Sequence, residues 1–254
     1  TQTVPANDTT YTAVWKEADD VVYTTKYYLE NESGEYELDK TRINKGTTGQ
    51  NVTADKEQYD NRLYHLTDDL PSGTVAADGS LIFRVHYDRN TYSISFNSMG
   101  GTVSTEKKTA RWGSNVIAPV PVRAGYAFAG WYTDEALTKK YTIPSVMPNE
   151  DRIVYAKWEA ADMTYNVVDY VEGTDGVYTA ASSKQETAKT DTEISPKPDI
   201  RNGFMTPAAL SQRVSADGST TINYYYARNK YNIKFVSEGS VVSEGRYTYG
   251  TLMP

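Results

Sequence analysis

The sequence contains no cysteine among its 254 residues and only two histidines, His65 and His86. Without cysteine the chain has no disulfide, no zinc–thiolate site and no cysteine nucleophile. The two histidines are far apart in the sequence, whereas two metal-binding histidines on one helix face stand four residues apart. We therefore expect no metal and no other cofactor.

Long hydrophobic runs are also missing, since no stretch approaches the roughly 20 apolar residues that a membrane-spanning helix needs. No signal peptide is visible, and both ends look like the middle of a unit, so we expect targeting and anchoring signals outside these residues. The formal net charge of −7 argues against a nucleic-acid partner, which attracts basic surfaces. Many Gram-positive surface proteins lack cysteine, which favours an extracellular location on the cell wall.

Catalytic motifs are absent as well: there is no Gly-x-Ser-x-Gly elbow, no Walker A loop and no Rossmann glycine set. A glycosidase needs two carboxylates about 5–10 Å apart across a cleft. The acidic pairs Asp19-Asp20, Asp68-Asp69 and Glu150-Asp151 fall in expected linkers and turns. We expect no enzyme, and keep a carbohydrate-active enzyme as a third hypothesis that would need such a pocket.

Tyrosine is abundant instead, at 22 residues, while hydrophobic residues make up only 39% of the chain. Tyrosine suits strands and half-buried surfaces, because its ring packs while its hydroxyl stays in water. The composition therefore predicts a mainly β protein with several small cores rather than one deep core.

Two stretches of the chain, 72–96 and 211–235, align without a gap and share an Asp-Gly-Ser turn and an Arg-Asn pair. Trp15 matches Trp158, and three spaced tyrosines recur in a second copy. Two unit types therefore alternate. We predict the C-terminal end of a first-type unit at 1–17, second-type units at 20–91 and 162–229, a complete first-type unit at 92–159, and the N-terminal part of another at 230–254. Very short linkers predict a stiff, elongated array of small tandem domains.

Within the second-type unit we expect strands at 21–30 and 36–44 around an Asn31–Gly34 turn, and a closing hairpin around Asp78-Gly79. Short helices are expected at Thr53–Tyr59 and Glu135–Lys140, each after a capping residue. Strands crossed by one short helix form the β-grasp pattern, so the expected fold class is α+β, β-grasp-like and mainly β.

The complete unit is similar to the internalin-type B-repeat, also called the Listeria–Bacteroides repeat. Trp112 stands where that family often has tyrosine. The residues that carry the resemblance are Phe96, Gly100-Gly101, Gly113, Pro119, Pro121, Gly125-Tyr126-x-Phe128-x-Gly130-Trp131-Tyr132-x-Asp134, Tyr141 and Tyr155-Ala156-Lys157-Trp158.

The second-type unit resembles mucin-binding-protein repeats. It shares Tyr27-Tyr28-Leu29-Glu30, Gly34-x-Tyr36, Gly46-Thr47-Thr48-Gly49 and an ending in Tyr-x-Arg-Asn, although the second copy has Ala188-Lys189-Thr190-Asp191 in place of the glycine string. Both resemblances imply β-grasp-like folds, spacing and adhesion, and no catalysis.

Two functional hypotheses follow. The first is a monomeric, non-enzymatic stalk of a bacterial surface protein, whose partners are its own neighbouring repeats and which presents a distal domain. The alternative is an adhesion module that binds host mucin glycans or a host protein through exposed aromatic faces. The candidate contacts are Trp112, which could stack on a sugar, and Tyr224, Tyr225 and Tyr226, which must occupy both faces of a strand.

Overall fold

The structure is a computed structural model that describes residues 3–253, and these form two compact units. The first unit contains the residues up to Ser95 together with Lys107–Ala118 and Ile143–Arg152. The second contains Phe96–Glu106, Pro119–Thr142 and the residues from Ile153 onward.

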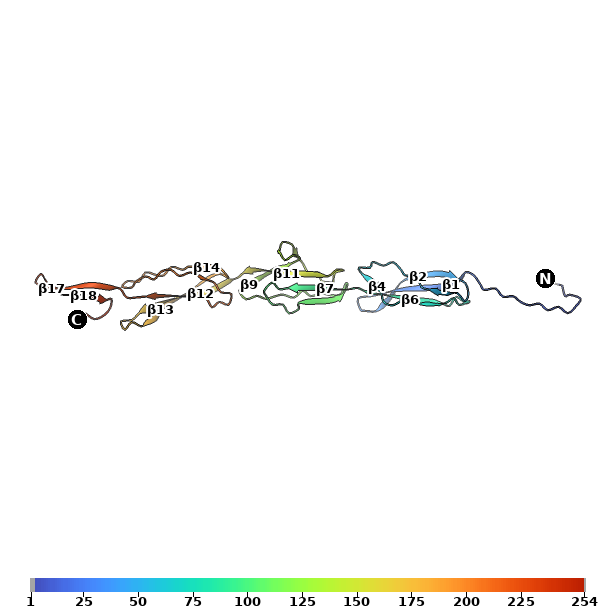
Figure 1. Cartoon of the computed structure of the whole chain (residues 1–254), viewed down its shortest axis with the longest axis horizontal. Coiled ribbons are helices and arrows are strands. Elements are labelled where there is room, and N and C mark those ends of the chain that lie inside the picture. The colour runs from blue at the N-terminus through green and yellow to red at the C-terminus, as the bar shows by residue number, and fades with distance from the viewer. Residues whose placement is uncertain (1–2, 254) are drawn as a thin grey trace. The chain divides into compact units, whose positions relative to one another are not determined.

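The main sheet of the first unit has the strand order β2-β1-β6-β4 (Figure 1). Strand β1 (Val21–Glu30) pairs antiparallel with β2 (Tyr36–Gly46) and parallel with β6 (Ile82–Arg89), which also pairs with β4 (Tyr64–Leu66). The Asn31–Gly34 turn joins β1 to β2 as predicted, because Gly34 adopts a left-handed φ of 83° and Asn31 Oδ1 accepts two backbone N–H groups.

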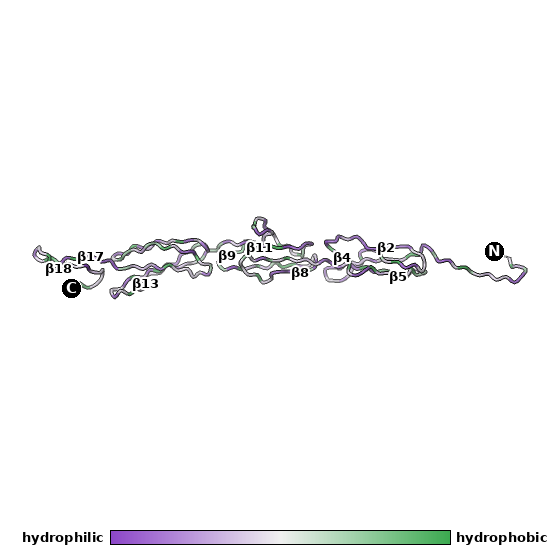
Figure 2. The backbone as a smooth tube through the Cα atoms, in the orientation of Figure 1, coloured by the Kyte–Doolittle hydropathy of each residue, from purple (hydrophilic) through white to green (hydrophobic). Residues whose placement is uncertain are grey.

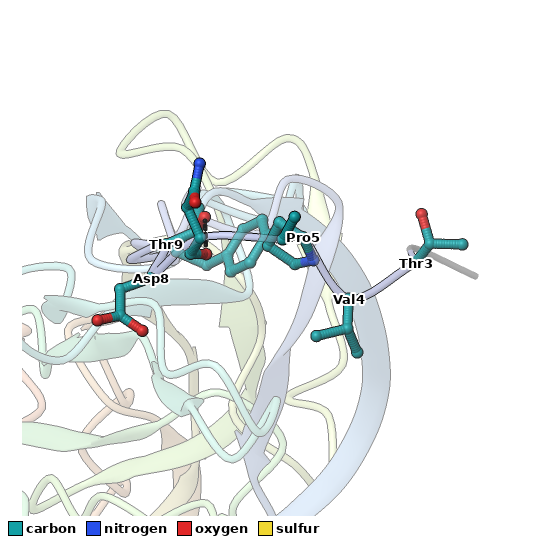
Figure 3. Close-up of a pocket in the computed structure, with 8 residues that line it drawn as sticks. Thr3, Val4, Pro5, Asp8 and Thr9 are labelled. Atoms are coloured by element: carbon teal, nitrogen blue, oxygen red, sulfur yellow. Dashed lines mark hydrogen bonds between the residues drawn. The ribbon is translucent and has the colours of Figure 1, made fainter.

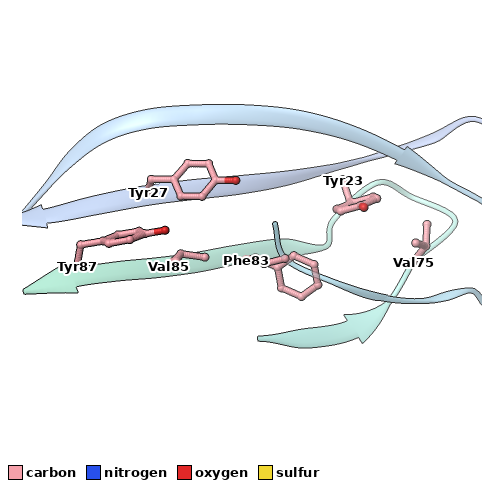
Figure 4. Close-up of a cluster of buried hydrophobic side chains, with 7 residues drawn as sticks. Tyr23, Tyr27, Val75, Phe83, Val85 and Tyr87 are labelled. Atoms are coloured by element: carbon pink, nitrogen blue, oxygen red, sulfur yellow. The ribbon is translucent and has the colours of Figure 1, made fainter. Parts of the chain in front are cut away.

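The core of this sheet is built largely from tyrosine. Side chains alternate between faces along a strand, so one face of β1 and β6 supplies the buried residues. Tyr27 and Tyr87 are almost completely buried, and Figure 4 shows their hydroxyls pointing the same way along the strands. The cluster consists of Tyr23, Tyr27, Ala54, Val75, Phe83, Val85 and Tyr87.

The first unit also contains β7 (Thr91–Asn97) up to Ser95, which pairs antiparallel with β8 (Lys107–Arg111). The Gly113 N–H donates to the Met147 carbonyl at 3.0 Å, and the Met147 N–H donates to the Ser114 carbonyl at 2.8 Å. These bonds tie 112–118 to 143–152 and bury the Met147 side chain completely.

In the second unit, β9 (Tyr126–Tyr132) lies between β10 (Lys140–Tyr141) and β11 (Arg152–Ala160), and pairs with both. Aromatic rings fill its core in a chain of contacts. Phe128 contacts Trp131 and Trp158 at centroid distances of 5.3 and 5.7 Å, and Trp131 contacts Phe96 at 5.2 Å. The Gly-Tyr-x-Phe-x-Gly-Trp-Tyr motif therefore places Phe128 and Trp131 in a core.

The rest of the second unit reproduces three of the four strands of the main sheet of the first. Strand β12 (Asp162–Glu172) pairs antiparallel with β13 (Tyr178–Lys189) and parallel with β16 (Thr221–Tyr226). The core is Tyr165, Val167, Ile194, Val214, Ile222, Tyr224 and Tyr226. Two further antiparallel pairs complete the strands: the short pair β14 (Glu193–Ile194) with β15 (Gln212–Arg213), and the longer hairpin β17 (Lys230–Ser237) with β18 (Ser240–Thr248).

The two predicted helices are wrong, since the described residues contain strands, turns and loops only. At 53–59 the helix is replaced by tyrosine contacts: the Tyr27 hydroxyl donates to the Asp55 carbonyl, and the Glu57 N–H donates to the Tyr87 hydroxyl. At 135–140 the Asp134 carboxylate accepts the N–H groups of Thr138 and Lys139, and Leu137 has a φ of 55° that ends any helix. The mainly β class is confirmed, and the β-grasp label stays a prediction.

The hairpin predicted around Asp78-Gly79 is wrong in its pairing. The turn exists, with Gly79 at a φ of 73°. However, β5 (Ser72–Thr74), which precedes it, pairs with β3 (Asn51–Thr53), while β6 runs parallel to β1. The turn therefore carries the chain from a small two-stranded pair back to the main sheet, and β15 and β16 repeat this arrangement.

Hydropathy along the described residues shows short apolar stretches interrupted by polar ones (Figure 2). Within residues 3–253 no helix has the length and apolar character needed to cross a bilayer.

Candidate functional site

The three consecutive tyrosines predicted as contact residues lie on opposite faces of β16. Tyr224 and Tyr226 are 1% and 0% exposed and belong to the core, whereas Tyr225 is 52% exposed. The Tyr224 hydroxyl donates to the Pro196 carbonyl, so its polar end is also occupied. Only Tyr225 of the three is therefore available for a ligand.

Tyr225 belongs to a group of three aromatic side chains on the outer face of the sheet. Its ring stacks on Tyr170 of β12, with centroids 5.0 Å apart and an interplanar angle of 17°. Tyr178 of β13 meets it edge-on at 5.5 Å. Tyr170 and Tyr225 are direct partners in the parallel pairing of β12 with β16, which is why their rings lie side by side.

The first unit carries the same arrangement on equivalent strands. Tyr28 of β1 and His86 of β6 are partners in the parallel pairing, and their rings stack at 5.1 Å and 26°. Tyr36 of β2 meets His86 edge-on at 4.7 Å. We call Tyr28–Tyr36–His86 and Tyr170–Tyr178–Tyr225 the aromatic triads. In the sequence, Tyr28 and Tyr36 match Tyr170 and Tyr178 as tyrosines. The third members do not match, because the first copy has histidine at position 86 where the second copy has Tyr225.

The two triads differ in their polar neighbours. The Tyr36 hydroxyl donates to the Asp88 carboxylate, and this hydrogen bond raises the pKa of Tyr36. The position equivalent to Asp88 is Ala227, so the second triad lacks this acceptor. Tyr36 and Tyr178 are 41% and 38% exposed, and both triads therefore present aromatic surface to solvent.

Trp112, the other predicted contact, is half-buried where β6 leads into the following repeat. Its indole meets the Tyr64 ring edge-on at 5.8 Å. Its backbone N–H donates to the Asn90 carbonyl at 2.7 Å, and its carbonyl accepts from Arg89 Nη1 at 2.6 Å. These contacts give Trp112 a structural environment at a junction.

The junction in the first unit is centred on a buried carboxylate. Glu30 is 5% exposed and accepts the Arg89 N–H at 2.9 Å and the guanidinium of Arg111. Arg89 is itself 5% exposed, and besides Trp112 its guanidinium reaches the Glu32 carbonyl at 3.4 Å. Two arginines thus hold the end of β1, the end of β6 and the turn after β8 together.

The second unit repeats this junction at equivalent positions. The Arg228 N–H donates to Glu172 Oε2 at 2.7 Å, and Arg228 Nη1 donates to the Tyr249 carbonyl at 2.7 Å. The Tyr249 N–H donates to the Asn229 carbonyl at 2.8 Å, as Trp112 does to Asn90. Phe204 meets Tyr249 edge-on at 5.9 Å, in the place of Tyr64. The repeated Arg-Asn pair in the sequence is the signal for this site, although the sequence does not show what the arginine binds.

The acidic pairs considered for catalysis are exposed, and Asp19, Glu150 and Asp151 hold loops in place. Asp19 accepts from the Thr47 hydroxyl at 3.1 Å, and Glu150 pairs with Arg152. Asp151 accepts the Ser93 N–H and hydroxyl at 2.7 and 2.8 Å, and these bonds lower the pKa of its carboxyl. A glycosidase acid requires a raised pKa. Among residues 3–253 no three acidic or histidine side chains gather into a metal-binding group.

Two hollows in the surface of the described residues also offer no catalytic arrangement. One of about 500 Å³ is lined only by the exposed stretch Thr3–Thr9 and Tyr11, and Figure 3 shows its labelled side chains spread along the segment. Another of about 310 Å³ lies beside 56–61 in the first unit. Its Glu57 carboxylate lies 2.9 Å from Lys40 Nζ and 2.5 Å from Arg42 Nη2, and the Lys40 contact lowers its pKa.

Comparison with known families identifies one segment of the chain. Residues 92–157 match the model of the Listeria-Bacteroides repeat domain, which confirms the resemblance seen in the sequence. A protein of Evansella cellulosilytica is 40% identical over 79 residues, covering 31% of this chain and 12% of that protein. A second protein of this organism is 29% identical over 179 residues, covering 66% and 20%. Their provisional names are membrane protein and Gly-rich membrane protein, and the chain spans at most a fifth of either.

Solved structures resemble the chain only distantly. The Bacillus anthracis TIE protein covers 83% of the chain, and 51% of its own chain is matched, with a TM-score of 0.40 and 7% identity. The type 2 repeat of the mucus binding protein MUB from Lactobacillus reuteri covers 82%, with 99% of its own chain matched, a TM-score of 0.22 and 10% identity. Scores this low do not guide the assignment.

Proposed function

We propose that this chain, which carries a Listeria-Bacteroides repeat at residues 92–157, is a non-enzymatic stalk segment of a bacterial surface protein. In this proposal the five segments delimited in the sequence are consecutive modules outside the cell. They work mechanically: each contacts its neighbours and adds length without one large core. The distal domain presented by the stalk performs the recognition.

The repeated arginine junction is the observation that supports this proposal. A linker of two or three free residues would let neighbouring modules swing. Here Asn90 and Asn229 are fixed by backbone hydrogen bonds, and Arg89 and Arg228 bind both the preceding strand and the following turn. A junction built twice in the same way restricts bending at both places where it occurs.

Small-angle X-ray scattering tests the stalk. A compact protein of this length has a radius of gyration of about 18 Å. We expect the measured radius to exceed that value at least about twofold, with a scattering profile typical of a rod. The Arg89→Met/Arg228→Met double variant should remain folded but give a smaller average radius, because its junctions bend. A wild-type profile typical of a compact globule would contradict the stalk.

The aromatic triads support a second candidate function, the binding of glycans. Sugar rings carry one face of weakly positive C–H groups, which packs on the electron-rich face of an aromatic ring. Exposed aromatic groups are unusual on a surface of charged and polar residues, and these occur twice in one register. In this proposal each triad binds a neutral sugar of a host mucin.

A mucin-glycan array tests the triads. We expect weak binding that falls about tenfold in the His86→Ala/Tyr225→Ala double variant, which disrupts both triads, since a lost aromatic contact costs about 1.4 kcal/mol. The Tyr11→Ala variant is the matched control, because Tyr11 is exposed but belongs to no triad. A blank array, or equal binding by both variants, would exclude the triads as the site.

A further inference from the structure

We infer that the first-copy sheet carries a docking face for the Gly-Tyr corner of a Listeria-Bacteroides repeat. The face consists of Thr48, Gly49 and Ala77, and we call it the Thr48 face. The argument starts from the second copy, where the equivalent residues are Thr190, Asp191 and Ala216. There the same face already holds such a corner, formed by Gly125 and Tyr126.

In the second copy the Gly125 carbonyl accepts two hydrogen bonds. It accepts the Thr190 hydroxyl at 2.6 Å and the Ala161 N–H at 2.9 Å. The Tyr126 hydroxyl donates to the Asp191 carboxylate. Gly125 has a φ of 73°, and a Cβ there would lie 2.7 Å from Ala216 and 2.8 Å from Thr190 Oγ1. The corner therefore fits only because this residue is glycine.

The backbone around the two faces is the same. The Thr48 N–H donates to the Ala18 carbonyl at 3.0 Å, and the Thr190 N–H donates to the Ala161 carbonyl at the same distance. The next residues, Gly49 and Asp191, have left-handed φ angles of 80° and 64°. Their N–H groups donate to the carbonyls of Val75 and Val214, both at 3.0 Å. The first copy thus has the geometry that receives the corner in the second.

What the first copy lacks is the corner itself. Thr48 Oγ1 is buried from solvent and has no hydrogen-bond partner among the described residues, although Thr190 Oγ1 has two carbonyl acceptors. Ala77 is exposed, whereas Ala216 is half-buried. Residues 3–17 are exposed throughout. A buried hydroxyl without a partner costs free energy, so a carbonyl placed against it would be stabilising.

The occupant is defined by chemistry: a left-handed glycine whose carbonyl faces Thr48, followed by tyrosine. Gly49 supplies no acceptor equivalent to Asp191, so the tyrosine contact is weaker here. We assign the corner to a repeat joined to Ala18 in the same chain, because Thr48 bonds to Ala18 as Thr190 bonds to Ala161, which follows the repeat that supplies the corner in the second copy. The inference is independent of the stalk, because docking can occur whatever the scattering profile shows.

The first arm of the test uses the 254-residue chain. We expect Thr190→Val to lower the Tm of the second unit by about 3–6 °C, since a buried hydrogen bond is lost. Thr48→Val should leave the Tm unchanged or raise it slightly, because it removes an unpartnered hydroxyl. The Thr190→Ser and Thr48→Ser variants keep the hydroxyl and should behave as wild type. Equal losses for the two valine variants would contradict the inference.

The second arm adds the occupant, in an extended chain where a copy of residues 88–160 replaces residues 1–17. Thr48→Val should now lower the Tm as Thr190→Val does. Replacing the glycine of the added copy that is equivalent to Gly125 by alanine should abolish this effect of Thr48→Val on the Tm. We expect a monomer by analytical ultracentrifugation, as docking within the chain requires. A concentration-dependent dimer that Thr48→Val dissociates would overturn this source in favour of a repeat from another chain. A Thr48→Val effect that stays absent in the extended chain overturns the inference.

Discussion

Raising the pH from about 9 to about 12 is expected to unfold both sheets with tyrosine cores. Burial raises the pKa of Tyr27, Tyr59, Tyr87 and Tyr226 above the ordinary value of 10.0. For Tyr165, burial and its hydrogen bond to Glu186 raise the pKa to about 12. The folded state thus disfavours tyrosinate. The contribution of these tyrosines to the free energy of unfolding is fully present below pH 10, and it is lost as the pH rises through their pKa values in the folded state.

The size of this effect follows from the shifts. One pKa unit corresponds to about 1.4 kcal/mol, so Tyr165 alone accounts for roughly 2–3 kcal/mol. Thermal unfolding followed by circular dichroism, together with tyrosinate absorbance, measures it across the pH range. Tyr165→Phe should flatten the pH dependence of the second unit. Tyr178→Phe is the control, because Tyr178 is 38% exposed and should leave the profile unchanged. Stability that stays constant to pH 12 would show that the tyrosines ionise without unfolding.

Replacing Arg89 by methionine is expected to destabilise the first unit by about 3 kcal/mol. The Trp112 carbonyl loses a charged donor at 2.6 Å, and hydrogen bonds to charged groups contribute about 1.5–3 kcal/mol each. Glu30 keeps the Arg89 backbone N–H and Arg111, so the loss comes from the hydrogen bonds of the Arg89 guanidinium to the Trp112 and Glu32 carbonyls. Urea unfolding measures the loss, and Arg228→Met should have a smaller effect because Arg228 is only half-buried.

The matched control is Arg84→Met, the same substitution on an exposed position of β6. It should change the free energy of unfolding by less than about 0.5 kcal/mol, as surface substitutions do. Losses of similar size in the Arg84 and Arg89 variants would mean that the junction contributes no more than ordinary surface charge.

Local signals in the sequence were sufficient for much of the strand pattern. The predicted strand at 21–30 matches β1, because alternating Tyr, Thr and Val residues end at an Asn-x-x-Gly turn. The Listeria–Bacteroides repeat was recognisable from a motif whose glycines and aromatic residues are required by one compact core. The internal repeat also aligned two tyrosines of each triad and the Arg-Asn pair of each junction, but it did not show what these residues contact.

Other features depended on contacts between distant residues. The helix expected at 53–59 does not form, because the Tyr27 and Tyr87 hydroxyls bind its backbone from strands far away in the sequence. Likewise, the turn at Asp78-Gly79 suggested a hairpin, but the preceding strand β5 has its partner in β3. Capping residues and turns report local preference, and these tertiary contacts override it.

The sequence by itself determined the repeat, the mainly β class and the period of two that places successive tyrosines on opposite faces. It did not determine which face would be buried. The parallel pairing of β1 with β6 and of β12 with β16 decided that Tyr224 and Tyr226 form a core while Tyr225 joins an exposed triad. Alternation is a property of the strand alone, whereas burial depends on what packs against each face, and only the tertiary structure supplies that.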